Sequence, residues 1–275
     1  MRMSRRRLVL THLVLWIALG WAITPVLWTL LSSFKPESDI FSTRIELFTR
    51  FTFENYIDLL ERGNFVTWGF NSILVATLTT GISVFLASTA AYAISRFRYR
   101  GRSASLYVFL VAQMFPAIIL LVPLYRIFVG LGWLDTPLSL IFAYATFAIP
   151  FSILMLKGYF DTIPYELEEA GRVDGLGVFG SFWRIVMPLS IPGIAVTAFF
   201  AFITAWNEFL FARAFLTNRD AMTLPVGMST FIDPLNQPWG ILTAASVLIS
   251  LPVMILFYVA QKYLISGMTT GGVKG

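Results

Sequence analysis

Six long apolar stretches, separated by polar segments, make up most of the chain. As helices, they are long enough to cross a bilayer core about 30 Å thick, which takes roughly 20 residues. We therefore expect an all-α, polytopic membrane protein with six transmembrane helices in a single transmembrane domain over residues 1–275. The expected spans run approximately over residues 8–31, 65–95, 105–130, 136–160, 191–216 and 239–265.

The amino-acid composition supports this interpretation and removes other classes of protein. Apolar residues make up 57% of the chain and charged residues only 13%, whereas a soluble domain has roughly 25% charged residues. Disordered chains are poor in apolar residues, so disorder is excluded as well. Because the chain has no Cys and a single His, we expect no disulfide, no metal site and no catalytic cysteine or histidine cluster.

Basic residues are distributed unevenly between the segments that join the spans. Segments on the N-terminal side hold thirteen Lys and Arg and five acids, whereas those on the opposite side hold seven and ten. Basic segments remain in the cytoplasm, so we expect the N-terminus there, and six spans return the C-terminus to the same side. The net charge of +5 divides into +8 inside and −3 outside, which indicates membrane topology rather than a nucleic-acid partner. The first apolar stretch is too long for a cleaved signal peptide, so we expect a retained anchor.

The loop over residues 161–190 contradicts this charge rule, because it lies on the basic side and yet holds five acids. Pro164 suits the start of a helix and Gly175 suits its end. We expect a short exposed helix over residues 165–174 and a second one near 179–186. An acidic helix is repelled by anionic lipid at a cytoplasmic membrane face. A protein partner is therefore the economical explanation, and an ordinary solvated connector is the alternative.

Two motifs in the sequence resemble a known family. The run from Glu169 to Gly175, followed nine residues later by Ile185-Val186-Met187-Pro188, resembles the Glu-Ala-Ala loop of ABC importer permeases. The tail over residues 267–275 resembles the C-terminus of the second permease subunit of maltose-type, carbohydrate-uptake importers, from which it departs at Met268 and Gly272. The family pattern has Ala where this chain has Gly171, which should loosen the helix by about 1 kcal/mol.

The resemblance implies a set of partners and their contacts. They are a second homologous permease, two cytoplasmic ATPase subunits and an extracytoplasmic solute-binding protein, with a sugar as the solute. The loop is expected to act as a coupling helix that docks on one ATPase through residues Glu166, Glu169, Ala170, Gly171, Asp174, Gly175, Ile185 and Pro188. The tail is expected to reach the ATPases through Gly267, Thr269, Gly271, Lys274 and Gly275.

The chain has no phosphate-binding motif of the form G-x-x-x-x-G-K-[ST], and its loops are too short for a nucleotide-binding domain. We therefore expect no catalytic residues and no cofactor in this chain, and another polypeptide must hydrolyse the ATP. The expected location is the cytoplasmic (inner) membrane of a prokaryote, with lipid around the spans.

Polar residues at membrane depth are candidates for the solute path. Trp206, Asn207 and Glu208 combine a ring face with hydrogen-bonding groups, as a sugar requires. Alternatively, Glu208 pairs with an arginine such as Arg126 or Arg213. Weaker candidates, which are equally explained by hydrogen bonds between helices or by packing, are Gln113, Asn71 and Tyr144.

A transporter driven by an ion gradient is the competing class. Such a carrier needs several carboxylates near the middle of the bilayer. The expected spans hold a single carboxylate, Glu208, and it lies away from the middle, so the pattern favours the ABC permease. Disaccharides, longer oligosaccharides, trehalose and glycerol phosphate all remain possible solutes at this point.

Overall fold

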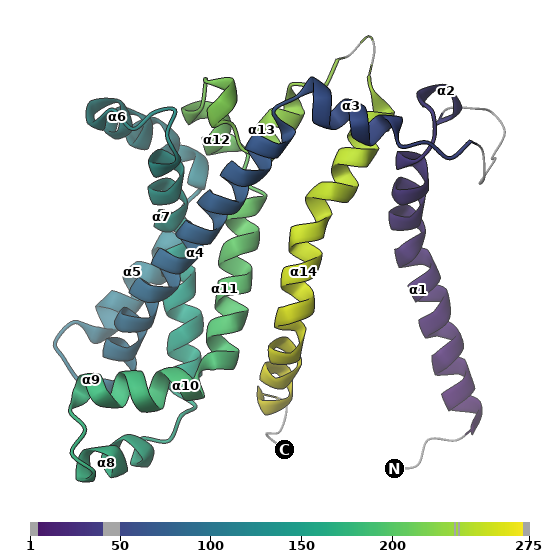
Figure 1. Ribbon diagram of the computed structural model, residues 1–275. Coiled ribbons are helices and arrows are strands. Elements are labelled where there is room, and N and C mark those ends of the chain that lie inside the picture. The colour runs from purple at the N-terminus through teal and green to yellow at the C-terminus, as the bar shows by residue number, and fades with distance from the viewer. Residues whose placement is uncertain (1–4, 41–49, 234, 236, 272–275) are drawn as a thin grey trace. The chain divides into compact units, whose positions relative to one another are not determined.

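The computed structural model describes residues 5–40, 50–233, 235 and 237–271. Within these residues the secondary structure is entirely helical, in agreement with the expected all-α class. Four helices are long and apolar enough to cross a membrane: α1 (Arg5–Ser33), α4 (Phe65–Arg96), α7 (Pro137–Phe160) and α14 (Trp239–Gly271). Two bent helix pairs bring the number to as many as six (Figure 1). The protein is thus a multi-pass membrane protein.

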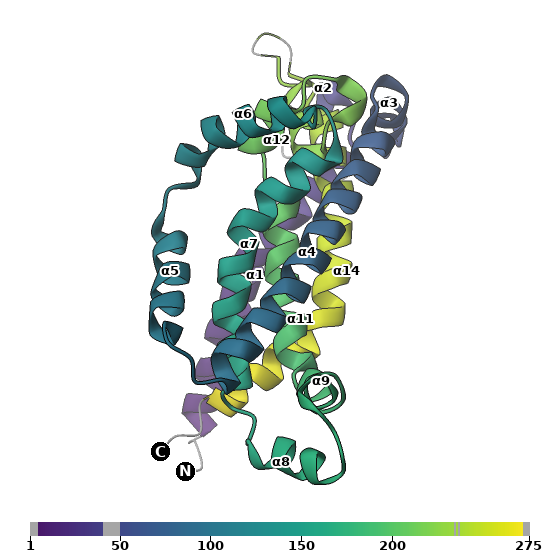
Figure 2. The same cartoon turned by 90° about the vertical axis from the view of Figure 1, so that its left-hand side faces the viewer.

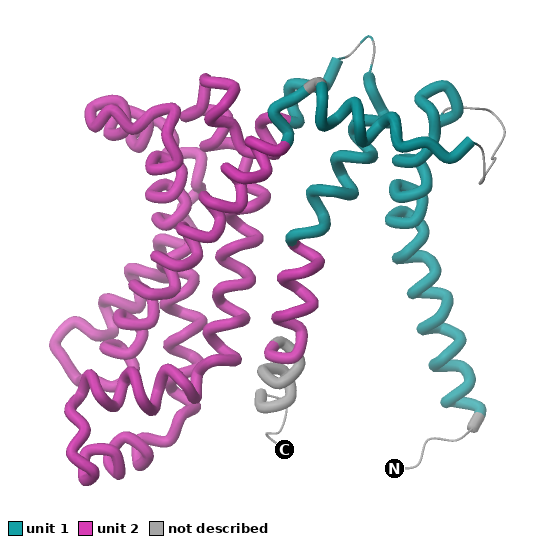
Figure 3. Tube along the Cα trace, in the orientation of Figure 1, with its two compact units in different colours: residues 1–65, 228–252 teal, residues 66–227, 253–275 magenta. Residues whose placement is uncertain are grey.

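The chain forms two compact units, a division that hydropathy does not predict (Figure 3). The first unit comprises residues 1–65 and 228–252, and the second comprises residues 66–227 and 253–275. Helix α14 begins in the first unit and ends in the second, so the units are not successive segments of the chain.

The first unit contains α1, the short helices α2 (Glu37–Ile40) and α3 (Glu54–Arg62), and the start of α14. The Glu37 carboxylate accepts hydrogen bonds from the backbone N–H groups of Trp239 (2.8 Å) and Gly240 (2.6 Å). It thereby satisfies two of the unpaired donors at the start of α14. The Asn55 amide donates to the carbonyls of Ser33 and Lys35, which ties α3 to the end of α1.

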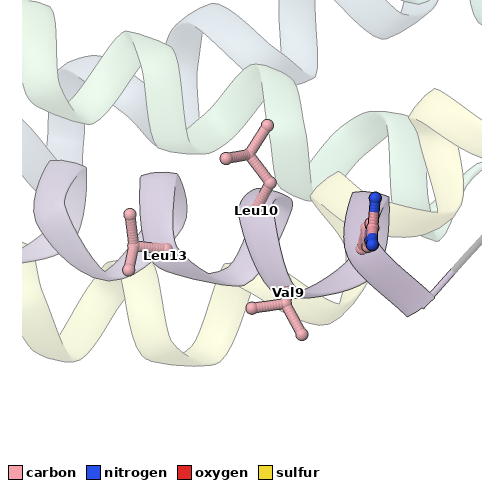
Figure 4. Close-up of a pocket in the computed structure, with 4 residues that line it drawn as sticks. Val9, Leu10 and Leu13 are labelled. Atoms are coloured by element: carbon pink, nitrogen blue, oxygen red, sulfur yellow. The ribbon is translucent and has the colours of Figure 1, made fainter.

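Helix α1 is exposed over residues 6–28, and its apolar side chains include Trp21, which is 83% exposed. Such a surface is suited to lipid or to another apolar helix. Figure 4 shows part of it: Arg6, Val9, Leu10 and Leu13 line a shallow hollow of about 340 Å³, and the labelled side chains are all hydrocarbon. Arg6 is the one polar residue in this lining, which offers too few hydrogen-bonding groups for a sugar.

The second unit is organised around α7, which buries half of its residues. Helices α5 (Arg102–Met114) and α11 (Ile191–Trp206) both pack on it. This unit also contains nearly all of α4, the second part of α14 and the start of α13 (Leu224–Ser229). Its other elements are η1 (Ala117–Leu120), α6 (Leu121–Leu131), α8 (Glu166–Val173), α9 (Val178–Ser181), the π-helical turn η2 (Phe182–Val186), α10 (Met187–Leu189), α12 (Leu210–Phe215) and η3 (Arg219–Ala221). In two perpendicular views, α8 and α9 lie at one end of this unit and α6 and α12 at the other (Figures 1 and 2).

Two of the expected spans are broken in the structure. The stretch expected over 105–130 forms a pair of helices bent by 95°. The bend falls at Phe115 and Pro116, because proline forces the residue before it out of the helical conformation. The stretch expected over 191–216 ends as a helix at Trp206, and α12 is a separate short helix beyond a break at residues 207–209.

The close approach of α11 to α7 depends on Gly193. A Cβ at this position would lie 2.5 Å from Cγ and 3.0 Å from Cβ of Tyr159. Small residues are used in this way where membrane helices pack closely.

We expect Gly193→Ala to lower the free energy of unfolding by about 1–3 kcal/mol, since the Tyr159 side chain is held too near its own backbone to move away. Thermal unfolding of the purified protein in detergent measures this as a lower midpoint. Gly158→Ala is the matched control, because Gly158 lies beside Tyr159 on α7 with no atom within 4 Å of its added Cβ. Equal shifts in the two variants would contradict the role of Gly193.

Candidate functional site

The acidic loop folds as its sequence predicts, with α8 over Glu166–Val173. The helix follows Pro164 and carries three acids in its first turn, which the positive end of the helix dipole favours. It ends at Gly175, whose φ of +88° is a left-handed conformation that glycine adopts without strain. The N–H of Leu176 then donates to the carbonyl of Gly171 (2.9 Å), which closes the last turn.

The acids of this loop divide into two groups by exposure. Glu166, Glu169 and Asp174 are exposed, as a docking surface requires, and so are Ala170, Gly175 and Pro188. Glu168, in contrast, is fully buried. Sequence reasoning counted Glu168 only as one more acid of the loop and assigned it no role.

The buried Glu168 carboxylate is held by two residues of α4. Tyr92 donates its hydroxyl hydrogen to Oε2 (2.7 Å), and Arg96 donates from Nε to Oε1 (2.5 Å). Arg96 also donates from Nη2 to the carbonyl of Ile163 (3.0 Å), just before α8. The only signal in the sequence was the four-residue spacing of Tyr92 and Arg96, which places both on one face of a helix.

Gly171 and Ile185 pack against each other rather than forming part of an exposed docking surface. Gly171 is buried, and a Cβ there would lie 2.5 Å from Cδ1 of Ile185 and 3.2 Å from Cδ1 of Leu176. The prediction that Gly171 acts mainly by loosening the helix is therefore incomplete. The absence of a side chain lets α8 lie closely against η2.

At the other end of the unit, Asp135 holds the segment that follows α12. Its φ is +58°, and its carboxylate accepts hydrogen bonds from the N–H and hydroxyl of Thr217 and from the N–H of Asn218. Partial burial by itself raises the pKa of Asp135, but these hydrogen bonds outweigh it, and the pKa lies below the ordinary value for aspartate.

The weaker solute candidates have structural roles in this conformation. Asn71 donates to the carbonyls of Asp220 (2.8 Å) and Met222 (2.9 Å), so it fastens the same segment to α4. Gln113 donates to the carbonyl of Phe147 (3.2 Å), which confirms the expected hydrogen bond between helices.

The Trp206-Asn207-Glu208 group lies at the break between α11 and α12. Trp206 is only 3% exposed and stacks on Phe202, with ring centroids 5.7 Å apart. The Glu208 carboxylate accepts the N–H groups of Phe211 (3.0 Å) and Ala212 (3.2 Å), so it caps α12. The proposed ion pair with Arg126 or Arg213 is absent from the described residues. Of the three, Asn207 is exposed.

The buried Tyr144 hydroxyl on α7 makes no hydrogen bond of ordinary geometry, although it interacts electrostatically with Glu208. The Tyr144 hydroxyl therefore lies close to the helix break at residues 207–209.

A pocket of about 440 Å³ lies between the C-terminal half of α4 and the segment formed by α9 and η2. Its lining is mostly aromatic, and its polar side chains are Thr89, Tyr92 and Trp183, of which Tyr92 already donates to Glu168 and Thr89 to the carbonyl of Leu86. The pocket therefore has too few free hydrogen-bonding groups for a sugar.

The second unit is thus a helical membrane domain with a short, partly exposed helix fastened to one end. A family model described as "Binding-protein-dependent transport system inner membrane component" matches residues 80–270, and the chain belongs to this family.

Individual relatives agree with this assignment. The chain is 38% identical to the probable ABC transporter permease protein YurM of Bacillus subtilis, over 91% of this chain and 83% of that protein. It is 34% identical to the trehalose transport system permease protein SugB of Mycobacterium tuberculosis, over 94% and 95%. A bacterial ABC transporter involved in the import of the acidic polysaccharide alginate has a similar fold, with a TM-score of 0.81, 24% identity, and coverage of 96% of this chain and 99% of that one.

We expect the hydrogen bonds of Asp135 to stabilise the protein above the unfolded-state pKa of about 3.9 and to be lost as the pH falls through the lower folded-state pKa. Asp135→Asn removes the titrating group, and Asn tolerates the left-handed backbone. The difference in thermal midpoint between wild type and variant should be largest near pH 6 and shrink toward about pH 3. A difference that is independent of pH would contradict this account.

Proposed function

We propose that this chain is the permease subunit of an ATP-driven ABC importer for a sugar and forms half of its translocation path. The observation that carries the proposal is the loop with α8, which combines the family's Glu-Ala-Ala pattern with an exposed acidic face. The solute class rests on relatives named for trehalose, for diacetylchitobiose and for trehalose/maltose, which are 34–36% identical to this chain.

The energy for transport comes from other subunits in this proposal. The sequence carries no phosphate-binding motif, so two cytoplasmic ATPases would hydrolyse ATP, and a second permease and an extracytoplasmic solute-binding protein would complete the importer. We place the assembly in the inner membrane of a prokaryote with both termini in the cytoplasm, because basic residues concentrate in the segments on that side.

The proposed ATPase-docking surface is the exposed face of α8 and its end, together with Pro188 later in the loop: Glu166, Glu169, Ala170, Asp174, Gly175 and Pro188. The tail is proposed to add a second contact. Its Gly267, Thr269 and Gly271 lie at the end of α14, where the side chains are outside the described part, and Lys274 and Gly275 lie outside the described residues.

For the solute path we propose the break at residues 207–209, with Asn207 and the Tyr144 hydroxyl as hydrogen-bonding groups. Transporters commonly place binding sites where a membrane helix is interrupted, because the backbone there is free of helical hydrogen bonds. Glu208 already caps α12. Its carboxylate is therefore not free for the coupled ion that a gradient-driven carrier would bind.

We expect Glu169→Ala combined with Asp174→Ala to weaken the association with the ATPase or to uncouple ATP hydrolysis from uptake, because two of the three exposed carboxylates of the docking face are lost. Co-purification of the ATPase with the tagged permease and solute uptake in the same cells measure the two effects. Normal co-purification together with normal uptake would contradict the docking role.

We expect Asn207→Ala to raise the sugar concentration for half-maximal uptake by about threefold to tenfold, the loss of roughly one hydrogen bond. The amount of assembled complex should not change, since the Asn207 side chain is exposed. Thr204→Ala is the control on the same helix, where the hydroxyl only donates to the carbonyl of Phe200. Equal uptake curves for wild type and Asn207→Ala would exclude Asn207 from the path.

A further inference from the structure

A fully buried carboxylate connects α8 to α4. Both oxygens of Glu168 accept hydrogen bonds from α4, and the side chains of Arg96 and Glu168 are 9% and 0% exposed. A buried charge is tolerated only where it is paired and hydrogen-bonded, as it is here. The contact is therefore specific: the backbone of α8 cannot shift along α4 without breaking a buried ion pair.

The same end of α4 holds the chain on both sides of α8. On the N-terminal side, Ser95 donates to the Asp161 carboxylate (2.6 Å), and Lys157 pairs with that carboxylate at 2.6 Å. On the C-terminal side, the Tyr92 ring packs on Phe182 of η2, with centroids 4.9 Å apart. The last turns of α4 thus contact the loop before, within and after α8.

Helix α8 depends on these contacts for its shape. It has eight residues, including the poor helix former Gly171, whereas isolated helices shorter than about 12 residues are marginal in water. Without an anchor, a push on its exposed face would unwind or tilt the helix instead of moving the structure behind it.

We propose that Glu168, Tyr92 and Arg96 form a positioning anchor that makes α8 and the end of α4 move as one body, and so transmits motion of the ATPase into the membrane-spanning helix. This inference rests on the proposed function. Two neighbouring acids then have different roles. Glu169 contacts the partner, whereas Glu168 fastens α8, which carries Glu169, to α4.

The test uses the whole importer, with its ATPases and binding protein, reconstituted in lipid vesicles. We compare Glu168→Gln, which keeps the shape but removes the charge, with Tyr92→Phe, which keeps the ring on Phe182 and removes the hydroxyl. The readout is sugar transported per ATP hydrolysed in complexes of confirmed subunit composition. Coupling energies in proteins correspond to about 5- to 150-fold changes, so we expect at least a fivefold lower ratio for Glu168→Gln and a smaller decrease for Tyr92→Phe.

Two further variants separate the anchor from docking and from general damage. Glu169→Gln should lower the amount of bound ATPase, whereas Glu168→Gln should leave the ATPase bound and hydrolysing. Tyr99→Phe removes an exposed hydroxyl shortly after α4 and should leave the ratio unchanged. Exchanging the charged pair (Arg96→Glu with Glu168→Arg) should recover part of the ratio lost in Glu168→Gln.

The anchor is refuted if assembled Glu168→Gln and Tyr92→Phe complexes transport as much sugar per ATP as wild type. It is also refuted if uptake decreases only in proportion to the amount of complex formed, which is what a purely structural role predicts. Failure of the proposed function has a different signature, because the wild-type chain itself would then bind no ATPase.

Discussion

The structure depends first on the requirement that backbone hydrogen-bonding groups be satisfied within the protein, because lipid offers them no partner. The four long helices meet most of this requirement internally, although α1, α7 and α14 each contain a proline, which cannot donate a helical hydrogen bond: Pro25, Pro150 and Pro252. Helical breaks are found at a proline, as at Pro116, or beside a side chain that hydrogen-bonds the backbone N–H groups left unpaired by the break. The Glu208 carboxylate does this for the start of α12. A polar residue that suits a sugar by composition is thus engaged by the backbone.

A corresponding constraint on charge shapes the opposite end of the second unit. A carboxylate can be buried there only with compensation, and α4 supplies it through Tyr92 and Arg96. The result is a helix with two distinct faces, one packed on the membrane-spanning unit and one exposed and acidic. For a subunit that takes its energy from another polypeptide, a surface that is both accessible and firmly attached is the essential requirement.

The sequence predicts the structure correctly where the signals are local, and fails where the outcome depends on residues far apart in the chain. Residues 166–173 were predictable as a helix because the local signals, from Pro164 to Gly175, act within a few residues of the chain. The break at Phe115 also has a local signal, Pro116, whereas the break at 207–209 has none, since hydropathy measures only whether a segment is apolar and not the path of its backbone. Gly171 was judged by helix propensity, although the side chain of Ile185, fourteen residues later, determines what fits there.

By itself, the sequence determined that the protein is a helical membrane protein of the ABC permease family and that its acidic loop is exceptional. These properties follow from composition, from the charge of whole segments and from contiguous motifs. Only the tertiary structure decided which acid of the loop faces outward and which is buried, because Arg96 and Glu168 are 72 positions apart in the chain and only the fold brings their side chains into contact. The sequence shows which residues carry a charge, whereas the free energy of burying that charge depends on the partners that folding places beside it.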